Sequence, residues 1–372
     1  MKKFKIDKPR EECGVFGISD HEDSSALVAL GLHALQHRGQ EGCGISSFDG
    51  KKFHLEKRQG LVGDHFTDQE VIRKLPGKFA IGHNRYSTTG EVSLRNIQPF
   101  FADLYTGGVS LAHNGNLTNA IELRNNLVKD GAIFRTTSDT ETIVQLIAKS
   151  NRKKITDKII DTLFQIQGAY SLVMMTNKKL IGIRDPFGIR PLVIGRLKNS
   201  FIFASETCAL DIVGATFLRE VENGEIVVIE NGKLTSIKPF PFKKARPCAF
   251  EYIYFARPDS LLNEKCAYEF RKKMGVELAK EHDITADFVV PVPDSGVPAA
   301  LGYSQYSKKS FELGLIRNHY VGRTFIEPTQ SIRSFGVKLK LNPTQTLIKN
   351  KSIILVDDSL VRGTTCHKIV KM

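Results

Sequence analysis

The stretch "KSIILVDDSLVRGTTCHKIVK", residues 351–371, has the pattern of a strand, a loop and a helix. The apolar run Ile353 to Val356 predicts a buried strand, and two acids, Asp357 and Asp358, follow it directly. In open α/β sheets, ligands bind outside the carboxyl ends of the strands. A second strand–loop–helix pattern, "DFVVPVPDSGVPAALGYSQY", precedes it. We therefore predict a parallel sheet with a ligand site at one edge.

The loop after the two acids has the composition of a phosphate site. It contains Ser359, Arg362, Gly363, Thr364 and Thr365 just before a helix. Backbone N–H groups in such a loop can surround a phosphate together with the helix N-terminus, although the Walker pattern GxxxxGK[ST] is absent. Two acids suit a ligand that also presents hydroxyls or a cation, as ribose phosphate with Mg²⁺ does. A solvated turn would explain a lone acid pair better than the whole string "VDDSLVRGTT".

Composition limits the class of protein. The chain has 372 residues, 41% of them hydrophobic, and six widely spread cysteines without a CxxC pair, which suits two domains in a reducing cytoplasm. No stretch is apolar for the length that a membrane span needs. The net charge of +13 would suit nucleic acid, a polyanionic small substrate or a chain whose acidic part is missing. Charge alone does not decide, but the basic residues form no dense tract, and we expect no nucleic-acid or membrane partner.

The chain divides into segments that differ in composition and in predicted secondary structure. Residues 1–12 form a hydrophilic leader without the apolar core of a secretory signal, and are a candidate pro-segment. Residues 13–240 show antiparallel strand patterns with a few helices, which predicts two sheets sandwiched between helical layers. The basic, proline-rich residues 238–248 predict a linker. Residues 250–372 carry the strand–loop–helix pattern, so we expect an α+β domain followed by an α/β domain.

Local patterns in the first domain predict individual elements. In "GEIVVIENGKLTSI", the pair Asn231-Gly232 supplies the positive φ angles of a type I′ hairpin turn. "SDTETIVQLIAKS" begins with Ser138 and Glu141, a capping-box pair that predicts a helix start. "SSALVALGLHALQHRG" predicts a helix that Gly39 can end. Its predicted apolar face comprises Leu27, Leu30, Ala34 and Leu35.

Polar residues in the first domain predict an acyl-transfer site. Cys13 alone proves little, because a lone strand cysteine is usually a packed core residue. Arg85 could bind a carboxylate, and Asp139 at a helix start could bind an ammonium group or cap the helix. Asn114 and Gly115 at a strand end could present a side-chain amide and a backbone N–H to one oxyanion. Together with a thiol, these groups suit an α-amino acid amide, with glutamine as the obvious candidate.

With "LQHRGQEGCGI", these motifs closely resemble the N-terminal-nucleophile glutamine amidotransferases. The string "VDDSLVRGTT" resembles the ribose-5-phosphate loop of type I phosphoribosyltransferases. The combination resembles the amidophosphoribosyltransferase family nearly end to end, with "EYIYFARPDS" and "HYVGRTF" between the two sites. The resemblance implies a four-layer αββα glutaminase sandwich followed by a parallel-sheet phosphoribosyltransferase domain.

The resemblance implies the role of the first domain. Cleavage behind Glu12 would make Cys13 the first residue; its thiolate would attack glutamine, with its own α-amine as the base. Asn114 and Gly115 would stabilise the oxyanion. The implied glutamine-binding residues are Arg85, Asp139 and Gly39. Ammonia would then pass to phosphoribosyl pyrophosphate (PRPP) and give 5-phosphoribosylamine, the first committed step of purine synthesis.

The resemblance also implies a PRPP site in the second domain. "PVPDSG" resembles the pyrophosphate loop. The basic residues 317–341 could form a mobile lid over a pyrophosphate, and an ordinary surface loop is the alternative. The implied PRPP-binding residues are Asp357, Asp358, Ser359, Arg362, Gly363, Thr364, Thr365, Asp294, Ser295, Gly296, Arg323 and Lys338. Lys338 stands where relatives often have Arg, which presents a different donor geometry. Mg²⁺ would be held by Ser295, Asp357 and Asp358.

Several features depart from the family pattern or extend it. The chain stops at Met372, soon after the PRPP loop, so we expect a C-terminally incomplete phosphoribosyltransferase domain. Cys248 matches the first of four cysteines that hold a 4Fe–4S cluster in some members, and a packed thiol is an equal alternative. The family also implies a homotetramer inhibited by purine nucleotides. Alternative interpretations are a non-catalytic PRPP- or nucleotide-binding protein, a glutaminase-only fragment, and an amidotransferase that makes glucosamine 6-phosphate.

Overall fold

The computed structural model describes residues 13–86, 93–282, 284–318, 341–360 and 364–372. The chain divides into two compact units, one that ends at Cys248 and one that begins at Ala249. The predicted linker, residues 238–248, lies at the end of the first unit, and the predicted pro-segment lies outside the described residues. No helix in the described part of the chain has the length and apolar character to cross a membrane.

Two antiparallel sheets form the centre of the first unit. The first sheet has the strand order β11-β9-β10-β1-β4-β2-β3, and the second has the order β13-β12-β8-β7-β6-β5. The strands of the first sheet are β1 (Gly14–Ile18), β2 (Gly42–Phe48), β3 (Phe53–Gln59), β4 (Phe79–Arg85), β9 (Val193–Leu197), β10 (Ser200–Ala204) and β11 (Thr216–Glu220). Those of the second are β5 (Phe100–Leu104), β6 (Gly107–Leu117), β7 (Gly168–Thr176), β8 (Lys179–Arg184), β12 (Ile226–Glu230) and β13 (Lys233–Ile237).

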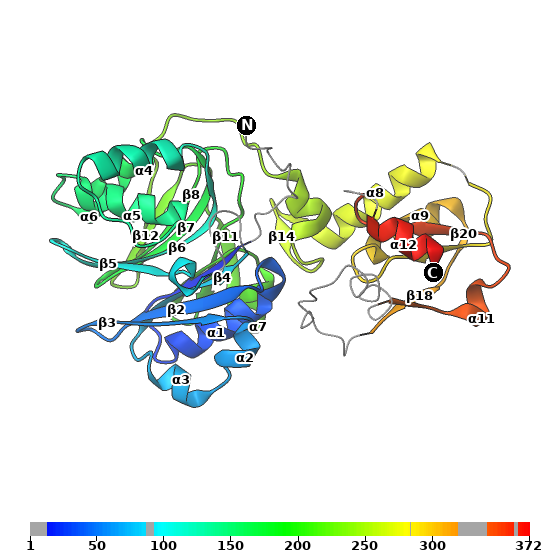
Figure 1. Ribbon diagram of the computed structural model, residues 1–372, viewed down its shortest axis with the longest axis horizontal. Coiled ribbons are helices and arrows are strands. Elements are labelled where there is room, and N and C mark those ends of the chain that lie inside the picture. The colour runs from blue at the N-terminus through cyan, green and yellow to red at the C-terminus, as the bar shows by residue number, and fades with distance from the viewer. Residues whose placement is uncertain (1–12, 87–92, 283, 319–340, 361–363) are drawn as a thin grey trace. The chain divides into compact units, whose positions relative to one another are not determined.

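Helices cover the outer face of each sheet in the first unit (Figure 1). On the first sheet they are α1 (Ser24–Ala34), η1 (Gln36–Arg38), α2 (Val62–His65), α3 (Gln69–Arg73) and α7 (Cys208–Ile212). On the second they are α4 (Ala120–Lys129), α5 (Asp139–Lys149) and α6 (Ile155–Leu163), and η2 (Leu94–Asn96) precedes β5. Alternate residues of β1 face opposite sides, so Phe16 packs against α1, and Val15 packs between the sheets with Val173 of β7. The predicted αββα sandwich is confirmed.

The local predictions for this unit are mostly confirmed. Asn231 and Gly232 have φ angles of 52° and 68° in the turn between β12 and β13. The helix predicted from "SSALVALGLHALQHRG" forms as α1 followed by η1, which ends at Gly39. The prediction that Leu30 faces the core is wrong, because Leu30 is 47% exposed while Val28 and Leu32 form the buried face.

The second unit contains the predicted parallel sheet. β16 (Phe288–Pro291) pairs in parallel with both β17 (Ser310–Phe311) and β20 (Ile353–Val356). A helix follows each of the two longer strands, α9 (Val297–Ser307) after β16 and α12 (Thr364–Lys371) after β20. The other elements are η3 (Glu251–Phe255), β14 (Leu261–Leu262), β15 (Lys265–Cys266), α8 (Ala267–Glu281), β18 (Leu315–Arg317), β19 (Leu341–Pro343) and α11 (Gln345–Ile348).

Candidate active site

Cys13 directly precedes β1, at the same level as the end of β4. Gly14 pairs with Asn84 across these antiparallel strands, which places Cys13 beside Arg85. The Cys13 thiol is buried and donates a hydrogen bond to the Tyr86 carbonyl oxygen at 3.5 Å. Burial raises the pKa of this thiol to about 11; the charges of Arg85 and Arg190 oppose the shift, and that of Asp139 adds to it. The nucleophile candidate therefore lies within the electrostatic range of both predicted glutamine-binding side chains.

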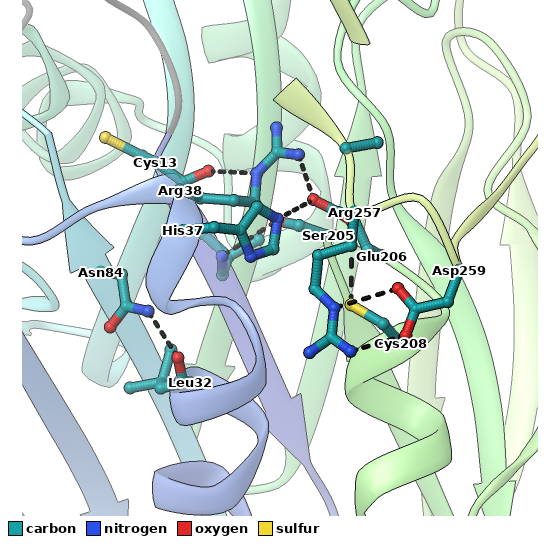
Figure 2. A network of polar contacts seen from close by, with 12 residues as sticks. Cys13, Leu32, His37, Arg38, Asn84, Ser205, Glu206, Cys208, Arg257 and Asp259 are labelled. Carbon is teal, nitrogen blue, oxygen red and sulfur yellow. Dashed lines mark hydrogen bonds and ion pairs between the residues drawn. The ribbon is translucent and has the colours of Figure 1, made fainter. Parts of the chain in front are cut away.

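The main chain of Cys13 is held by a buried ionic network (Figure 2). The Arg38 Nε donates to the Cys13 carbonyl oxygen at 3.1 Å, and its Nη1 donates to the Glu206 carboxylate at 2.5 Å. His37 Nε2 lies 2.8 Å from the same carboxylate oxygen. Both Arg38 and Glu206 are fully buried. This pair was not predicted from the sequence: Arg38 stands beside Gly39 in the motif "LQHRGQEGCGI", but nothing local marks Glu206 as its partner.

Asn114 and Gly115 lie next to each other on β6. The Asn114 side chain is fully buried, and neither its amide nitrogen nor its amide oxygen has a hydrogen-bond partner among the described residues. Gly115 has a φ of 148°, and a Cβ built there would lie 2.1 Å from the Ala169 carbonyl oxygen. Only glycine fits this position. A buried amide without a partner is costly, so this arrangement suits a ligand that supplies the missing hydrogen bond.

Asp139 and Gly39 complete the predicted glutamine site. Asp139 is the first residue of α5, and its carboxylate accepts a hydrogen bond from the Leu117 N–H at the end of β6, at 2.9 Å. A Cβ on Gly39 would lie 2.6 Å from the Arg85 carbonyl carbon, so Gly39 packs directly on the end of β4. The structure therefore places the predicted residues at the adjoining ends of β1, β4, β6 and α5.

The two predicted phosphate loops meet at one edge of the parallel sheet in the second unit. β16 and β20 are neighbours, with Pro291 opposite Val356, and the Val292 N–H donates to the Val356 carbonyl oxygen at 2.8 Å. A Cβ on Gly296 would lie 2.5 Å from that same oxygen. The loop that carries Asp294, Ser295 and Gly296 is thus adjacent to the loop that begins with Asp357.

The acids after β20 have the character of a cation site. Burial and the charge of Asp358 raise the pKa of the half-buried Asp357 carboxyl. The ionised form of Asp357 is therefore disfavoured, and a bound cation would stabilise it. The Asp358 N–H donates to the Asp357 carboxylate at 2.9 Å, and the Ser359 hydroxyl donates to that of Asp358 at 2.5 Å. The described residues contain no group of three or more His, Cys, Asp or Glu that could hold a metal. Two carboxylates still fit Mg²⁺, which commonly uses one or two with substrate phosphates and waters.

Some of the predicted PRPP-binding and cluster-binding residues make other contacts, and some lie outside the described residues. Asp294 is exposed and forms an ion pair with Arg317. Arg323, Lys338, Arg362 and Gly363 lie outside the described residues, and Thr364 and Thr365 begin α12. Cys248 is half-buried, and its N–H donates to the Ile189 carbonyl oxygen at 3.2 Å. The described residues show no ligand group around it that would fit an iron–sulfur cluster.

Comparison with known proteins defines the class first. A family described as a glutamine amidotransferase domain matches residues 83–211, which include Arg85, Asn114, Gly115 and Asp139. The first unit therefore carries a glutamine amidotransferase domain, the class of protein that its fold and site geometry indicate.

Relatives along the whole chain define the family. The amidophosphoribosyltransferase of Rhizobium etli is 57% identical over 371 residues, which cover 98% of this chain and 75% of that relative. A solved structure described as the allosteric regulatory enzyme of purine biosynthesis has a TM-score of 0.92 and 45% identity, over 97% of this chain and 77% of its own. Glutamine PRPP amidotransferase from Bacillus subtilis, solved with ADP and GMP, has a TM-score of 0.91 and 45% identity, over 97% of this chain and 78% of its own. The chain belongs to the amidophosphoribosyltransferase family.

Proposed function

We propose that the protein makes 5-phosphoribosylamine from glutamine and PRPP, the first committed step of de novo purine synthesis. The observation that carries this proposal is the arrangement around Cys13. Its thiol lies beside Arg85, in the field of Asp139, and the chain offers a buried Asn114 amide without a partner next to Gly115. These are the groups that hydrolysis of an α-amino acid amide requires.

In the first half of the reaction, cleavage behind Glu12 frees the α-amine of Cys13. That amine takes the thiol proton, and the thiolate attacks the glutamine amide carbon. Asn114 and Gly115 stabilise the tetrahedral oxyanion, and the amine returns the proton to the departing ammonia. Water then hydrolyses the thioester to glutamate. Arg85 binds the substrate α-carboxylate, and Asp139 binds its ammonium group. Gly39, which has no side chain, lets the main chain lie close to the bound glutamine.

In the second half, ammonia attacks C1 of PRPP and pyrophosphate leaves. Asp357 and Asp358 bind the ribose hydroxyls, and the loop from Ser359 to Thr365 binds the 5-phosphate through backbone N–H groups. Asp294, Ser295 and Gly296 bind the pyrophosphate, with Arg323 and Lys338 contributing cations. Mg²⁺, held by Ser295, Asp357 and Asp358, would neutralise charge on the leaving pyrophosphate.

The proposal extends to partners and location. Purine nucleotides are proposed as feedback inhibitors, supported by the relative solved with ADP and GMP, and the assembly is proposed to be a homotetramer. None of the six cysteines, all of which lie in the described part of the chain, is in a disulfide bond, which supports a reducing compartment such as the cytoplasm. A 4Fe–4S cluster with Cys248 as a ligand stays a prediction, which iron analysis of the purified protein would test.

The test is an assay of the purified protein that measures both products, glutamate and pyrophosphate. With glutamine, PRPP and Mg²⁺, we expect glutamate and pyrophosphate in equal amounts, and an intact mass that corresponds to a chain beginning at Cys13. PRPP binding without pyrophosphate release would instead indicate a non-catalytic nucleotide-binding protein. Glutamate without pyrophosphate would indicate a glutaminase alone.

A further inference from the structure

A buried polar network lies behind the candidate glutamine site and reaches Asp139: the Thr140 hydroxyl donates to the Asp139 carboxylate at 3.5 Å, and His113 Nδ1 lies 4.0 Å from the same oxygen. Its centre is Gln98, which precedes β5. The Gln98 side-chain oxygen accepts a hydrogen bond from the His113 N–H at 2.7 Å, and its Nε2 donates to the Thr140 hydroxyl at 3.0 Å. His113 Nδ1 lies 3.0 Å from the same hydroxyl. One side chain therefore bridges strand β6 and the first turn of helix α5.

The network also reaches the first sheet. His83 of β4 lies with its Nε2 3.1 Å from the His113 carbonyl oxygen. A carbonyl only accepts, so Nε2 of His83 carries the proton. Burial lowers the pKa of His83 to about 3, and the ring is neutral at physiological pH. This hydrogen bond joins the two sheets close to the ends that carry the candidate site.

The partners of Gln98 and the adjoining His83 lie one or two residues from the proposed glutamine site in sequence. His113 precedes Asn114, Thr140 follows Asp139, and His83 is two residues before Arg85. The His113 ring also supports the backbone of Gly115, since a Cβ built at Gly115 would lie 2.9 Å from His113 Nε2. The network is buried throughout: Gln98 is 6% exposed, His113 1%, and Thr140 and His83 are fully buried.

We propose that Gln98, Thr140 and His113 form a positioning network that fixes the distance between the oxyanion-binding strand and the ammonium-binding start of α5. Gln98 is the spacer, because its two amide atoms bond to the two elements separately. The proposal rests on the function proposed above, in which Asn114, Gly115 and Asp139 act on one glutamine molecule. A displacement of about 1 Å between such groups can reduce turnover about 100-fold.

Thr140→Val and Thr140→Ser form a matched pair of variants. Valine has the shape of threonine but no hydroxyl, so it breaks the bonds to Gln98 and His113 and the 3.5 Å bond to Asp139. Serine keeps the hydroxyl. We expect Thr140→Val to lower kcat/KM for glutamine hydrolysis by about 10-fold to 100-fold, with a raised KM as well as a lowered kcat, and Thr140→Ser to stay within about threefold of the parent protein.

Two thiol reagents separate a positioning role from general damage. A diazoketone analogue of glutamine needs its α-carboxylate and α-amino group to be held while it labels Cys13, whereas iodoacetamide needs only the thiol. We expect Thr140→Val to slow labelling by the analogue about tenfold or more and to leave iodoacetamide labelling nearly unchanged. Equal slowing with both reagents, or a parent-like kcat/KM, would overturn the proposal.

Two further results complete the design. Gln98→Met and Gln98→Glu test the spacer itself, and they decide alone if Thr140→Val does not fold. Methionine removes both hydrogen bonds of Gln98 but leaves the bond from Thr140 to Asp139, while glutamate can still accept from the His113 N–H and the Thr140 hydroxyl. A selective loss in Gln98→Met with recovery in Gln98→Glu supports the network, and identical behaviour of the two contradicts it. Failure of the parent protein itself to hydrolyse glutamine and react with the analogue would instead refute the proposed function.

Discussion

At the scale of single residues, the Cys13 thiol is a poor nucleophile while it is part of an uncut chain. Burial raises its pKa to about 11, more than the nearby Arg85 and Arg190 lower it. The thiolate is the reactive form of cysteine, and only a small fraction of Cys13 is thiolate near neutral pH. A base is therefore required, and the α-amine freed by cleavage behind Glu12 would supply it.

This state of the thiol predicts a difference between the uncut and the processed protein. In a chain that retains residues 1–12, alkylation of Cys13 by iodoacetamide should rise about tenfold per pH unit from about pH 8 to pH 10, since the thiolate fraction rises in this way below the pKa. The processed protein should react faster near neutral pH. Mass spectrometry of the Cys13 peptide over time measures both rates. A flat pH profile for the uncut chain would contradict the raised pKa.

The same shift predicts a small effect of pH on stability. The neutral thiol is favoured in the folded state, so its stabilisation is complete below the usual pKa of 9.0 and is lost as pH rises to about 11. The free energy of unfolding should fall more steeply over this range in the uncut parent protein than in Cys13→Ala. Denaturant titrations at several pH values measure the difference, and parallel curves would argue against it.

At the scale of elements, the Arg38–Glu206 pair ties η1 to the segment before α7. Both side chains are fully buried, and Arg38 holds the Cys13 carbonyl as well. Removing one partner of a buried pair leaves the other charge uncompensated. Glu206→Ala should therefore lower the free energy of unfolding by about 3–5 kcal/mol, and Glu206→Gln by less, because an amide oxygen can still accept from Arg38.

The exposed pair of Lys238 and Glu222 provides the control for this prediction. Its side chains are 54% and 59% exposed and lie 2.6 Å apart, so Glu222→Ala should change the free energy of unfolding by no more than about 1 kcal/mol. Urea denaturation measures both variants. Equal effects of Glu206→Ala and Glu222→Ala would show that the buried pair does not organise this part of the unit.

The elements that the sequence predicted correctly depend on local signals. The β12–β13 turn follows from two adjacent residues, and the strands follow from apolar runs. The start of α5 was only partly predictable: Ser138 caps the Thr140 N–H, but the Glu141 carboxylate accepts from the N–H groups of Arg135 and Thr136. Tertiary folding of the preceding loop sets that choice of partners.

The candidate site shows the same limit. Motifs singled out its individual residues, yet Arg38–Glu206 and Gln98–Thr140 join segments far apart in the chain. Buried polar residues such as Gln98 have no distinctive local pattern, because their partners come from other elements. A single sequence therefore names the groups that touch a substrate more readily than the groups that hold them in place.

At the scale of the whole molecule, the two candidate sites lie in two separate units. A substitution in one site should therefore abolish the activity proposed for that site and leave the other activity intact. Asp357→Asn removes a carboxylate charge at the edge of the parallel sheet. It should reduce pyrophosphate release from PRPP about 100-fold or more, because we propose that this charge orients the substrate and the cation. Glutamine hydrolysis measured without PRPP should stay near that of the parent protein. Exposed Asp287→Asn, in the same unit and paired with Lys351, is the control and should leave both activities intact. Loss of both activities in a folded Asp357→Asn variant would contradict the separation.

The most direct test of the account is the activity of Cys13→Ala with two nitrogen sources. The substitution removes the proposed nucleophile and changes no residue of the unit that holds the parallel sheet. We predict that pyrophosphate release from PRPP with glutamine falls to background, while release with ammonia at alkaline pH, in the presence of Mg²⁺, stays close to that of the parent protein. Retention of glutamine-dependent release, or equal loss with both nitrogen sources in a folded variant, would contradict the account.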